Sequence, residues 1–329
     1  MPPKMYEVKQ IEGKGLGFVA VKNISKGSLI LKETPQMPRV KGVEAPNPKV
    51  PGSIEAQEKA LKNWVEKVIS LFNEMNPADQ EEYMTLHNGI VDRNSSGMIR
   101  IRSEYDQKKA DEILKINKII DIYAKNNFQN GLSIKTSRLN HSCKPNAVNS
   151  ANAVNSEFNE VRAIRNIKAG QEITISYKEG PGLFGLWTTQ NRQEILLETW
   201  GFACICEFCQ ESNDDDRTKI QSKIQVLIKE VENLQPETPE KCSKMIATYK
   251  KLYKLGKKMK APPTSLYAVL KNGYQTSRYG YRVFRFTENY HKSEEFKKDS
   301  ITFSNAAEAF AKVLGTELFG GFMEKTSKI

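Results

Sequence analysis

The sequence predicts an α+β protein, in which a β-rich domain is interrupted by a helical insert and followed by an all-helical C-terminal domain. Strand-like segments occupy residues 6–33 and return at 147–177. Between them, residues 52–126 place apolar side chains at the helical period of about 3.6 residues, and from about residue 218 nearly every segment does the same. These three observations separate one β-rich region from two helical ones.

The first forty residues contain three strand-like segments, YEVKQIE, GFVAV and SLILKE. The glycine-rich GKGLG at residues 13–17 separates the first two, and the KG turn at Lys26 and Gly27 precedes the third. We expect these segments to form a β-meander. Prolines 35, 38, 46, 48 and 51 then mark a loop, because neither a helix nor a strand propagates through them.

The insert is expected to contain three helices. The first runs from Ile54 toward Phe72 with one apolar face. Asn76 is a candidate N-cap, with Pro77 at the first helical position of a second helix. The third is predicted at about residues 104–125.

Strand-like segments return at residues 147–150, 158–165 and 172–177, so the β segments on both sides of the insert are expected to form one compact domain. We place the domain boundaries at residues 1–210 and 216–329. The second domain should be helical, with one helix starting at a Thr238 cap. Two domains fit a chain of 329 residues, since single cores stop growing near ~250–300.

The composition indicates a globular protein. Hydrophobic residues make up 39% of the chain, which is enough for a packed core. No apolar run approaches the ~20 residues of a membrane helix, and MPPKMYEVKQ lacks an apolar signal segment. We therefore expect a nuclear and/or cytoplasmic monomer with no membrane contact.

The net charge of +11 comes from the C-terminal third. Residues 217–329 carry 22 Lys and Arg against 11 Asp and Glu, whereas residues 1–216 carry 28 of each. Basic surfaces in general attract nucleic acid, acidic protein segments or anionic membranes, and here the expected contacts are weak ones with nucleic acid or an acidic protein. The plainer interpretation is a well-solvated helical surface, because the lysines are dispersed.

The cysteine pattern favours a metal site over disulfides, because the count of five is odd and three crowd into GFACICEFCQ as C-x-C-x-x-C. Three thiolates are one ligand short of a closed tetrahedral zinc site. His141, Cys143 and Cys242 are candidates for the fourth ligand, with Cys143 preferred for its polar, irregular surroundings. The alternative is three buried cysteines without metal. Four protein ligands would make the zinc structural.

The NHSC motif at residues 140–143 raises a second hypothesis, a nucleophilic cysteine with a histidine base. We expect the His141 and Cys143 side chains to point apart in an extended chain, which disfavours this pair. Only His87 and His291 could replace His141 as the base.

Two further features allow both a structural and a functional interpretation. GKGLG is either a hairpin turn or a stretch of backbone that can come close to a small ligand. A dinucleotide-binding interpretation is disfavoured, because that glycine motif must be followed by a helix, whereas GKGLG is followed by a strand-like segment. Tyr177 ends the EITISY strand as a core or rim aromatic, unless the surrounding motifs give it a role.

Taken in order, four segments resemble those of the SET-domain protein lysine methyltransferases: GKGLG, SRLNHSCKPNA, GQEITISY and FACICEFC. The resemblance covers about residues 5–40 and 127–210, with the insert where the family commonly carries one. The layout is most similar to the SMYD group and related fungal SET proteins. No cysteine precedes Cys143, so the MYND zinc finger of SMYD proteins is absent.

The resemblance implies a pseudoknot-like β fold, with the segment at Asn140 threaded beside the strand that ends at Tyr177. It also implies S-adenosylmethionine as the methyl donor and Tyr177 as the catalytic tyrosine. A structural zinc would fold the post-SET segment over the active site. The residues that match the family's cofactor positions are Lys14, Gly15, Leu16, Gly17, Asn127, Asn140, His141 and Phe202, and those that match the zinc ligands are Cys143, Cys204, Cys206 and Cys209.

The implied activity is that of a protein-lysine N-methyltransferase, whose partner would be a histone or non-histone protein with an acceptor lysine. The alternative is a non-catalytic SET-like binding protein that engages a partner through its basic helical domain. Tyr177, Asn140 and the complete cysteine set favour the enzyme.

Overall fold

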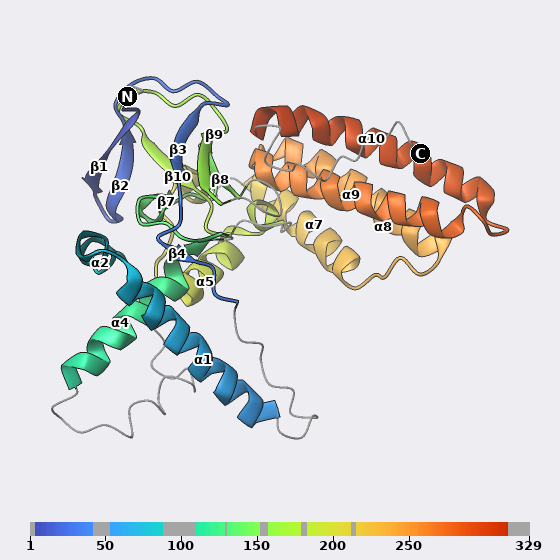
Figure 1. Cartoon of the computed structure of the whole chain (residues 1–329). Helices are drawn as coiled ribbons and strands as arrows, with labels where there is room; N and C mark the ends of the chain where they lie inside the picture. The colour runs from blue at the N-terminus through green and yellow to red at the C-terminus, as the bar shows by residue number, and fades with distance from the viewer. Residues whose placement is uncertain are drawn as a thin grey trace.

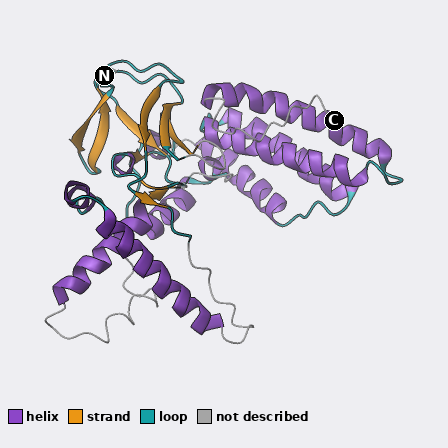
Figure 2. Cartoon of the chain, viewed as in Figure 1, coloured by secondary structure: helices purple, strands orange, loops and turns teal. Residues whose placement is uncertain are grey.

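The computed structural model describes residues 4–41, 53–87, 110–128, 130–151, 157–178, 183–211 and 215–314. Small β-sheets form the body to which two helical parts attach, the insert on one side and the long C-terminal helices on another (Figures 1 and 2). This is the α+β arrangement that the sequence predicts. Among the described helices, none is long and apolar enough to cross a membrane.

The first sheet has the strand order β1-β2-β10-β7. Strands β1 (Tyr6–Ile11) and β2 (Gly15–Ala20) form an antiparallel hairpin, and β10 (Glu172–Ile175) pairs with the other edge of β2. Gly13 and Gly15 have φ of 70° and 74°, so the GKGLG turn uses a backbone conformation that favours glycine. Strand β7 (Asn140–His141) runs parallel to β10.

The predicted meander is wrong at its third strand. Strand β3 (Leu29–Glu33) pairs with β9 (Asn159–Ala163), and β8 (Ala147–Ala151) completes that sheet. The cause is that β10 already occupies the second edge of β2. A third small sheet joins β4 (Met37–Pro38), β6 (Gly131–Leu132) and β5 (Asn127–Phe128).

The described part of the insert contains helices α1 (Ser53–Glu74), α2 (Pro77–Tyr83) and α4 (Ala110–Asn126). Asn76 caps α2 as predicted, because its side chain accepts a 2.9 Å hydrogen bond from the Asp79 amide. The expected start of the third helix at residue 104 lies outside the described residues. The insert has its own apolar core, which includes Val68, Phe72, Tyr83, Ile119 and Tyr123.

The C-terminal part consists of α7 (Asp215–Glu232), α8 (Pro239–Lys258), α9 (Pro263–Phe284) and α10 (Tyr290–Leu314). Thr238 caps α8 as predicted. Helices α9 and α10 approach closely at Gly273, where an added Cβ would lie 2.5 Å from the Phe303 ring.

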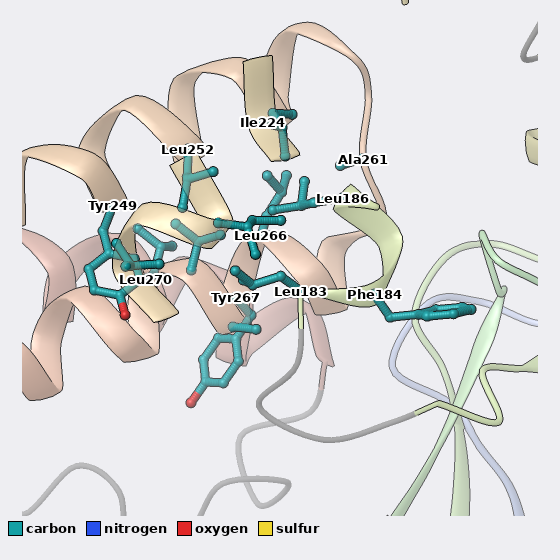
Figure 3. Packing of buried hydrophobic residues seen from close by; sticks show 14 of the residues in the cluster. Leu183, Phe184, Leu186, Ile224, Tyr249, Leu252, Ala261, Leu266, Tyr267 and Leu270 are labelled. Carbon is teal, nitrogen blue, oxygen red and sulfur yellow. The ribbon is translucent and has the colours of Figure 1, made fainter. Parts of the chain in front are cut away.

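A short 3-10 helix at Phe184–Leu186 connects the β body to these helices. Leu183 and Leu186 pack among Leu252, Leu266 and other apolar side chains of α7, α8 and α9 (Figure 3). The Phe184 side chain points away from that group toward the strands (Figure 3), and its ring centroid lies 6.0 Å from that of His141. One continuous apolar core therefore joins the C-terminal helices to the neighbourhood of the NHSC motif.

Candidate active site and metal centre

The NHSC segment lies beside the end of β10, as the resemblance implies. Asn140 pairs with Thr174 and His141 with Ile175 in parallel register. The strand ends at Ile175, and the chain then bends so that the Tyr177 amide donates a 3.0 Å hydrogen bond to His141 Nδ1. The Tyr177 hydroxyl donates to the Leu139 carbonyl at 2.8 Å.

A cavity of about 510 Å³, a volume typical of small-molecule sites, is lined in part by Leu139, Asn140, His141 and Tyr177. The β1–β2 turn, the NHSC segment, Tyr177 and the stretch after α5 (Thr189–Trp200) form its walls. The predicted residues that line it are Lys14, Gly15, Leu16, Asn127, Asn140, His141, Tyr177 and Phe202. Gly17 is not part of the lining; a Cβ there would lie 2.5 Å from Asn140 Nδ2, so Gly17 leaves space for that side chain.

Glu172 organises the polar side of the cavity, and the sequence analysis did not single it out. Its carboxylate receives the Lys14 Nζ at 2.6 Å and the Asn140 Nδ2 at 3.0 Å. Its backbone carbonyl accepts from Asn146 Nδ2 at 2.8 Å, while the Asn146 Oδ1 accepts from the Thr174 amide at 2.8 Å. The two motif asparagines therefore have fixed orientations.

Asn127 lines this cavity and carries a buried acceptor without a partner in the described part of the chain. Its side-chain oxygen is buried and has no hydrogen-bond partner among the described residues. A buried polar atom without a partner is costly, which is a reason to expect a donor from a bound molecule.

Tyr177, Trp200 and Phe202 form an aromatic wall of the cavity. The Tyr177 ring lies 5.6 Å from that of Trp200 and 6.0 Å from that of Phe202, the latter at an interplanar angle of 88°. Burial raises the pKa of the Tyr177 hydroxyl, and the nearby Glu172 carboxylate raises it further, so this phenol stays protonated at neutral pH. Trp200 did not appear in the sequence analysis, although it lies only two residues before Phe202.

The insert supplies another wall through Thr85, Leu86, His87, Lys125 and Asn126. Lys125 Nζ donates to the Thr199 carbonyl, and His87 Nε2 lies 3.4 Å from the Trp200 carbonyl. These two carbonyls belong to the last turn of α5, where a helix leaves carbonyls without an internal partner. The insert thus holds the helix end that leads directly to Phe202.

The four predicted zinc ligands come together. The sulfur atoms of Cys143, Cys204, Cys206 and Cys209 all lie within 4.8 Å of one another, and all four residues are buried. A tetrahedral zinc with Zn–S bonds of about 2.3 Å requires S···S separations of about 3.8 Å, so the group fits this metal. Cys242 is not part of the group: it lies buried in α8 with its thiol directed at the Pro236 carbonyl, 3.4 Å away.

The expectation that His141 and Cys143 point apart is wrong. His141 Nε2 lies 3.3 Å from Cys143 Sγ, because residues two apart in an extended segment project from the same face. Burial lowers the pKa of His141 to about 3, so the ring is neutral; its Nδ1 accepts from the Tyr177 amide, and its proton is therefore on Nε2, facing the sulfur. Cys143 is 2% exposed and lies among the other thiols, away from the cavity lining. This location, and not the direction of the side chains, argues against a nucleophilic role.

Comparison with known proteins identifies the class that this geometry represents. Residues 15–178 match the family model described as the SET domain. The chain therefore belongs to the SET-domain proteins.

Within that class it is distantly homologous to the SET5 and SMYD lysine methyltransferases. Over 89 residues it is 37% identical to the histone-lysine N-methyltransferase SET5 of Scheffersomyces stipitis, covering 27% of this chain and 18% of that protein. Over 209 residues it is 28% identical to the set5 protein of Schizosaccharomyces pombe, with coverages of 63% and 50%. Over 109 residues it is 34% identical to SMYD3 of Mus musculus, with coverages of 32% and 24%. The chain thus spans half or less of the length of each of these three relatives.

Proposed function

We propose that the protein is an S-adenosylmethionine-dependent methyltransferase that acts on lysine side chains of histone or non-histone proteins. The observation that carries the proposal is the convergence of Asn127, Asn140, Tyr177 and Phe202 on one cavity beside a four-cysteine group. The similarity to SET5 and SMYD proteins supports the same class of reaction.

The residues present fit the methyl donor. The Asn127 side-chain oxygen, unpartnered among the described residues, could accept from a hydroxyl or ammonium group once it faces the donor, and the Phe202 ring offers a flat face to an aromatic base. Lys14 and the glycine-rich turn would approach the donor from the hairpin side. When bound, S-adenosylmethionine supplies the methyl group, which passes from its sulfonium sulfur to the amine nitrogen as the C–S electron pair stays with sulfur.

The protein's own residues would then orient the reactants. The Tyr177 hydroxyl donates a hydrogen bond to the Leu139 carbonyl, so its oxygen lone pairs remain able to make weak C–H···O contacts to a polarised methyl group. The aromatic wall excludes water and favours the neutral form of an entering lysine amine, as burial does for any amine. Alignment in such a site can supply much of the rate acceleration without a strong general base.

We further propose that Cys143, Cys204, Cys206 and Cys209 bind one structural zinc ion. The ion would tie the NHSC segment to the stretch that follows α5, which carries Phe202 and contributes Cys204 to the cavity wall. In this arrangement the metal stabilises the site and takes no part in methyl transfer.

Incubation of the protein with S-adenosylmethionine labelled in its methyl group tests the enzymatic proposal, with core histones and a cell extract as acceptors. We expect label in protein and, after hydrolysis, in methylated lysine. Donor binding without label in any acceptor would contradict the proposal and favour a non-catalytic SET-like binding protein, whose basic C-terminal helices would be the surface to examine.

A further inference from the structure

Arg192 is a fully buried cation beside the cysteine group. It lies in α5, and its relative exposure is 0%. Its Nη1 donates to the Trp187 carbonyl at 2.5 Å, and its Nη2 lies 3.1 Å from Thr189 Oγ1 and 3.6 Å from Cys209 Sγ. The Nε atom is buried without a hydrogen-bond partner among the described residues.

No carboxylate forms an ion pair with Arg192 in the described part of the chain. A buried guanidinium stays charged, and a buried charge without a counter-charge is strongly unfavourable. The cysteine group is in contact with it, because Cys209 Sγ accepts from its Nη2, and would be an anionic partner once its thiols bind the proposed zinc as thiolates.

The charge balance of the proposed zinc site calls for such a cation. Four thiolates and one Zn²⁺ carry a net charge of about −2, enclosed in an apolar core. Charge-assisted hydrogen bonds to a thiolate stabilise its anionic, metal-binding form.

A second guanidinium, that of Arg217, lies against the Phe208 ring beside the cysteine group. Phe208, which directly precedes Cys209, has the Arg192 Cζ 4.8 Å and the Arg217 Cζ 3.8 Å from its ring centroid. Arg217 differs from Arg192 in that it pairs with Glu211 at 3.3 Å. Arg192 is therefore the cation that the thiolates can use most directly.

We propose that Arg192 is the buried counter-cation of the zinc-thiolate group and is required for tight retention of the metal. This inference rests on the proposed zinc site and goes beyond it, because it assigns a metal-stabilising role to a residue that is not a ligand. It also explains why an arginine is tolerated in this core: its charge is balanced only when the thiolates are formed.

The test measures zinc transfer from the native protein to a chromogenic chelator, such as 4-(2-pyridylazo)resorcinol, in the parent and in Arg192→Met, Arg192→Gln and Arg192→Lys. Mutation of residues that contact the metal ligands commonly lowers metal affinity by about 10–100-fold. We expect losses in that range for Met and Gln, and a clearly smaller loss for Lys, which keeps the charge. Arg285→Met, an exposed arginine at the end of α9, should match the parent.

A cobalt-substituted protein separates this role from simple packing. Loss of the cation should shift the thiolate-to-cobalt charge-transfer band to longer wavelength, an effect that a packing defect alone does not produce. Zinc retention and band position unchanged in Arg192→Met would overturn the proposal. If that variant does not fold, equal zinc retention in Gln and Lys would overturn it. A parent protein without zinc would instead reject the zinc site itself, and methyl transfer remains a separate measurement.

Discussion

The Tyr177 hydroxyl donates a 2.8 Å hydrogen bond to the backbone carbonyl of Leu139, the residue directly before Asn140. The bond crosses from the chain that leaves β10 to the motif segment beside it, so it fixes the tyrosine against the asparagine that lines the same cavity. Its direction matters, because a hydroxyl that donates this bond keeps oxygen lone pairs with which it can accept from another group.

Tyr177→Phe should therefore lower methyl transfer by about 100-fold or more, since small losses of alignment have effects of that size. Cofactor affinity should change little. Unfolding should become easier by about 1 kcal/mol, the net contribution of one hydrogen bond. Labelled methyl transfer, calorimetric binding and urea denaturation check the three parts. Tyr279→Phe, at an exposed position of α9, is the matched control, and a Tyr177→Phe variant as active as the parent would remove Tyr177 from the mechanism.

Cys206→Ser should lower bound zinc below one ion per chain, because a serine hydroxyl is not deprotonated at neutral pH and binds zinc poorly. Binding of the methyl donor should weaken together with zinc binding, since Cys204 and Phe202 belong to the cavity wall. Elemental analysis and calorimetric titration measure both. Cys242→Ser provides the control: this cysteine is buried but lies outside the group, so zinc should stay at the parent level. Equal zinc in the two variants would contradict the four-cysteine site.

Glu33 holds the turn that leads into Leu139. Its buried carboxylate accepts from the Lys135 amide at 3.0 Å and from both the amide and the hydroxyl of Thr136 at 2.8 Å. The short 3-10 helix Thr136–Arg138 follows, and the Leu139 amide donates back to the Thr136 carbonyl. A strand residue about a hundred positions earlier thus fixes the acceptor of the Tyr177 bond.

Glu33→Gln should lower the free energy of unfolding by about 1.5–3 kcal/mol. Both carboxylate oxygens of Glu33 accept hydrogen bonds, whereas a glutamine side chain has one accepting oxygen and no charge. Urea denaturation measures the loss. Glu7→Gln is the comparison, since that exposed carboxylate pairs with Lys9 on the surface, where such pairs contribute about 0–1 kcal/mol. Equal losses in both variants would contradict the role of Glu33 as an anchor of the turn.

Local sequence patterns predicted what depends on neighbouring residues. The glycine turn, the Asn76 and Thr238 caps and the meeting of four cysteines follow from spacing, chain chemistry and the resemblance to SET proteins. The pairing of β3 with β9 does not, because an alternating segment specifies a strand without naming its partner.

Long-range polar contacts could not be predicted from local sequence patterns either. Lys125 and His87 reach α5 carbonyls that are 74 and 113 positions away in the chain, and neither residue carries a local signal of that role. For His141 and Cys143 the expectation failed for a simpler reason: the rule of alternating sides was applied to residues two apart, which lie on the same side.

The last prediction concerns pH. Burial raises the pKa of Asp121 in α4 to about 6 from its ordinary 3.8, and Lys125 one turn later lowers it only in part. A raised pKa means that folding favours the protonated carboxyl. Its stabilising contribution is complete below about pH 4 and is lost as the pH rises through about 6. Because the carboxyl is only half-buried, solvent screening limits the effect to about 1 kcal/mol or less.

Asp121→Asn should therefore raise the melting temperature at pH 7.5 by about 2 °C and leave it unchanged near pH 4, as scanning calorimetry at the two pH values would measure. Glu112→Gln, at an exposed position of the same helix, should show no such difference between the two pH values. A lower melting temperature for Asp121→Asn at pH 7.5 would mean that attraction to Lys125 outweighs burial. The sign of the change thus decides whether burial or the attraction to Lys125 dominates at Asp121, next to the lysine that donates to the Thr199 carbonyl at the end of α5.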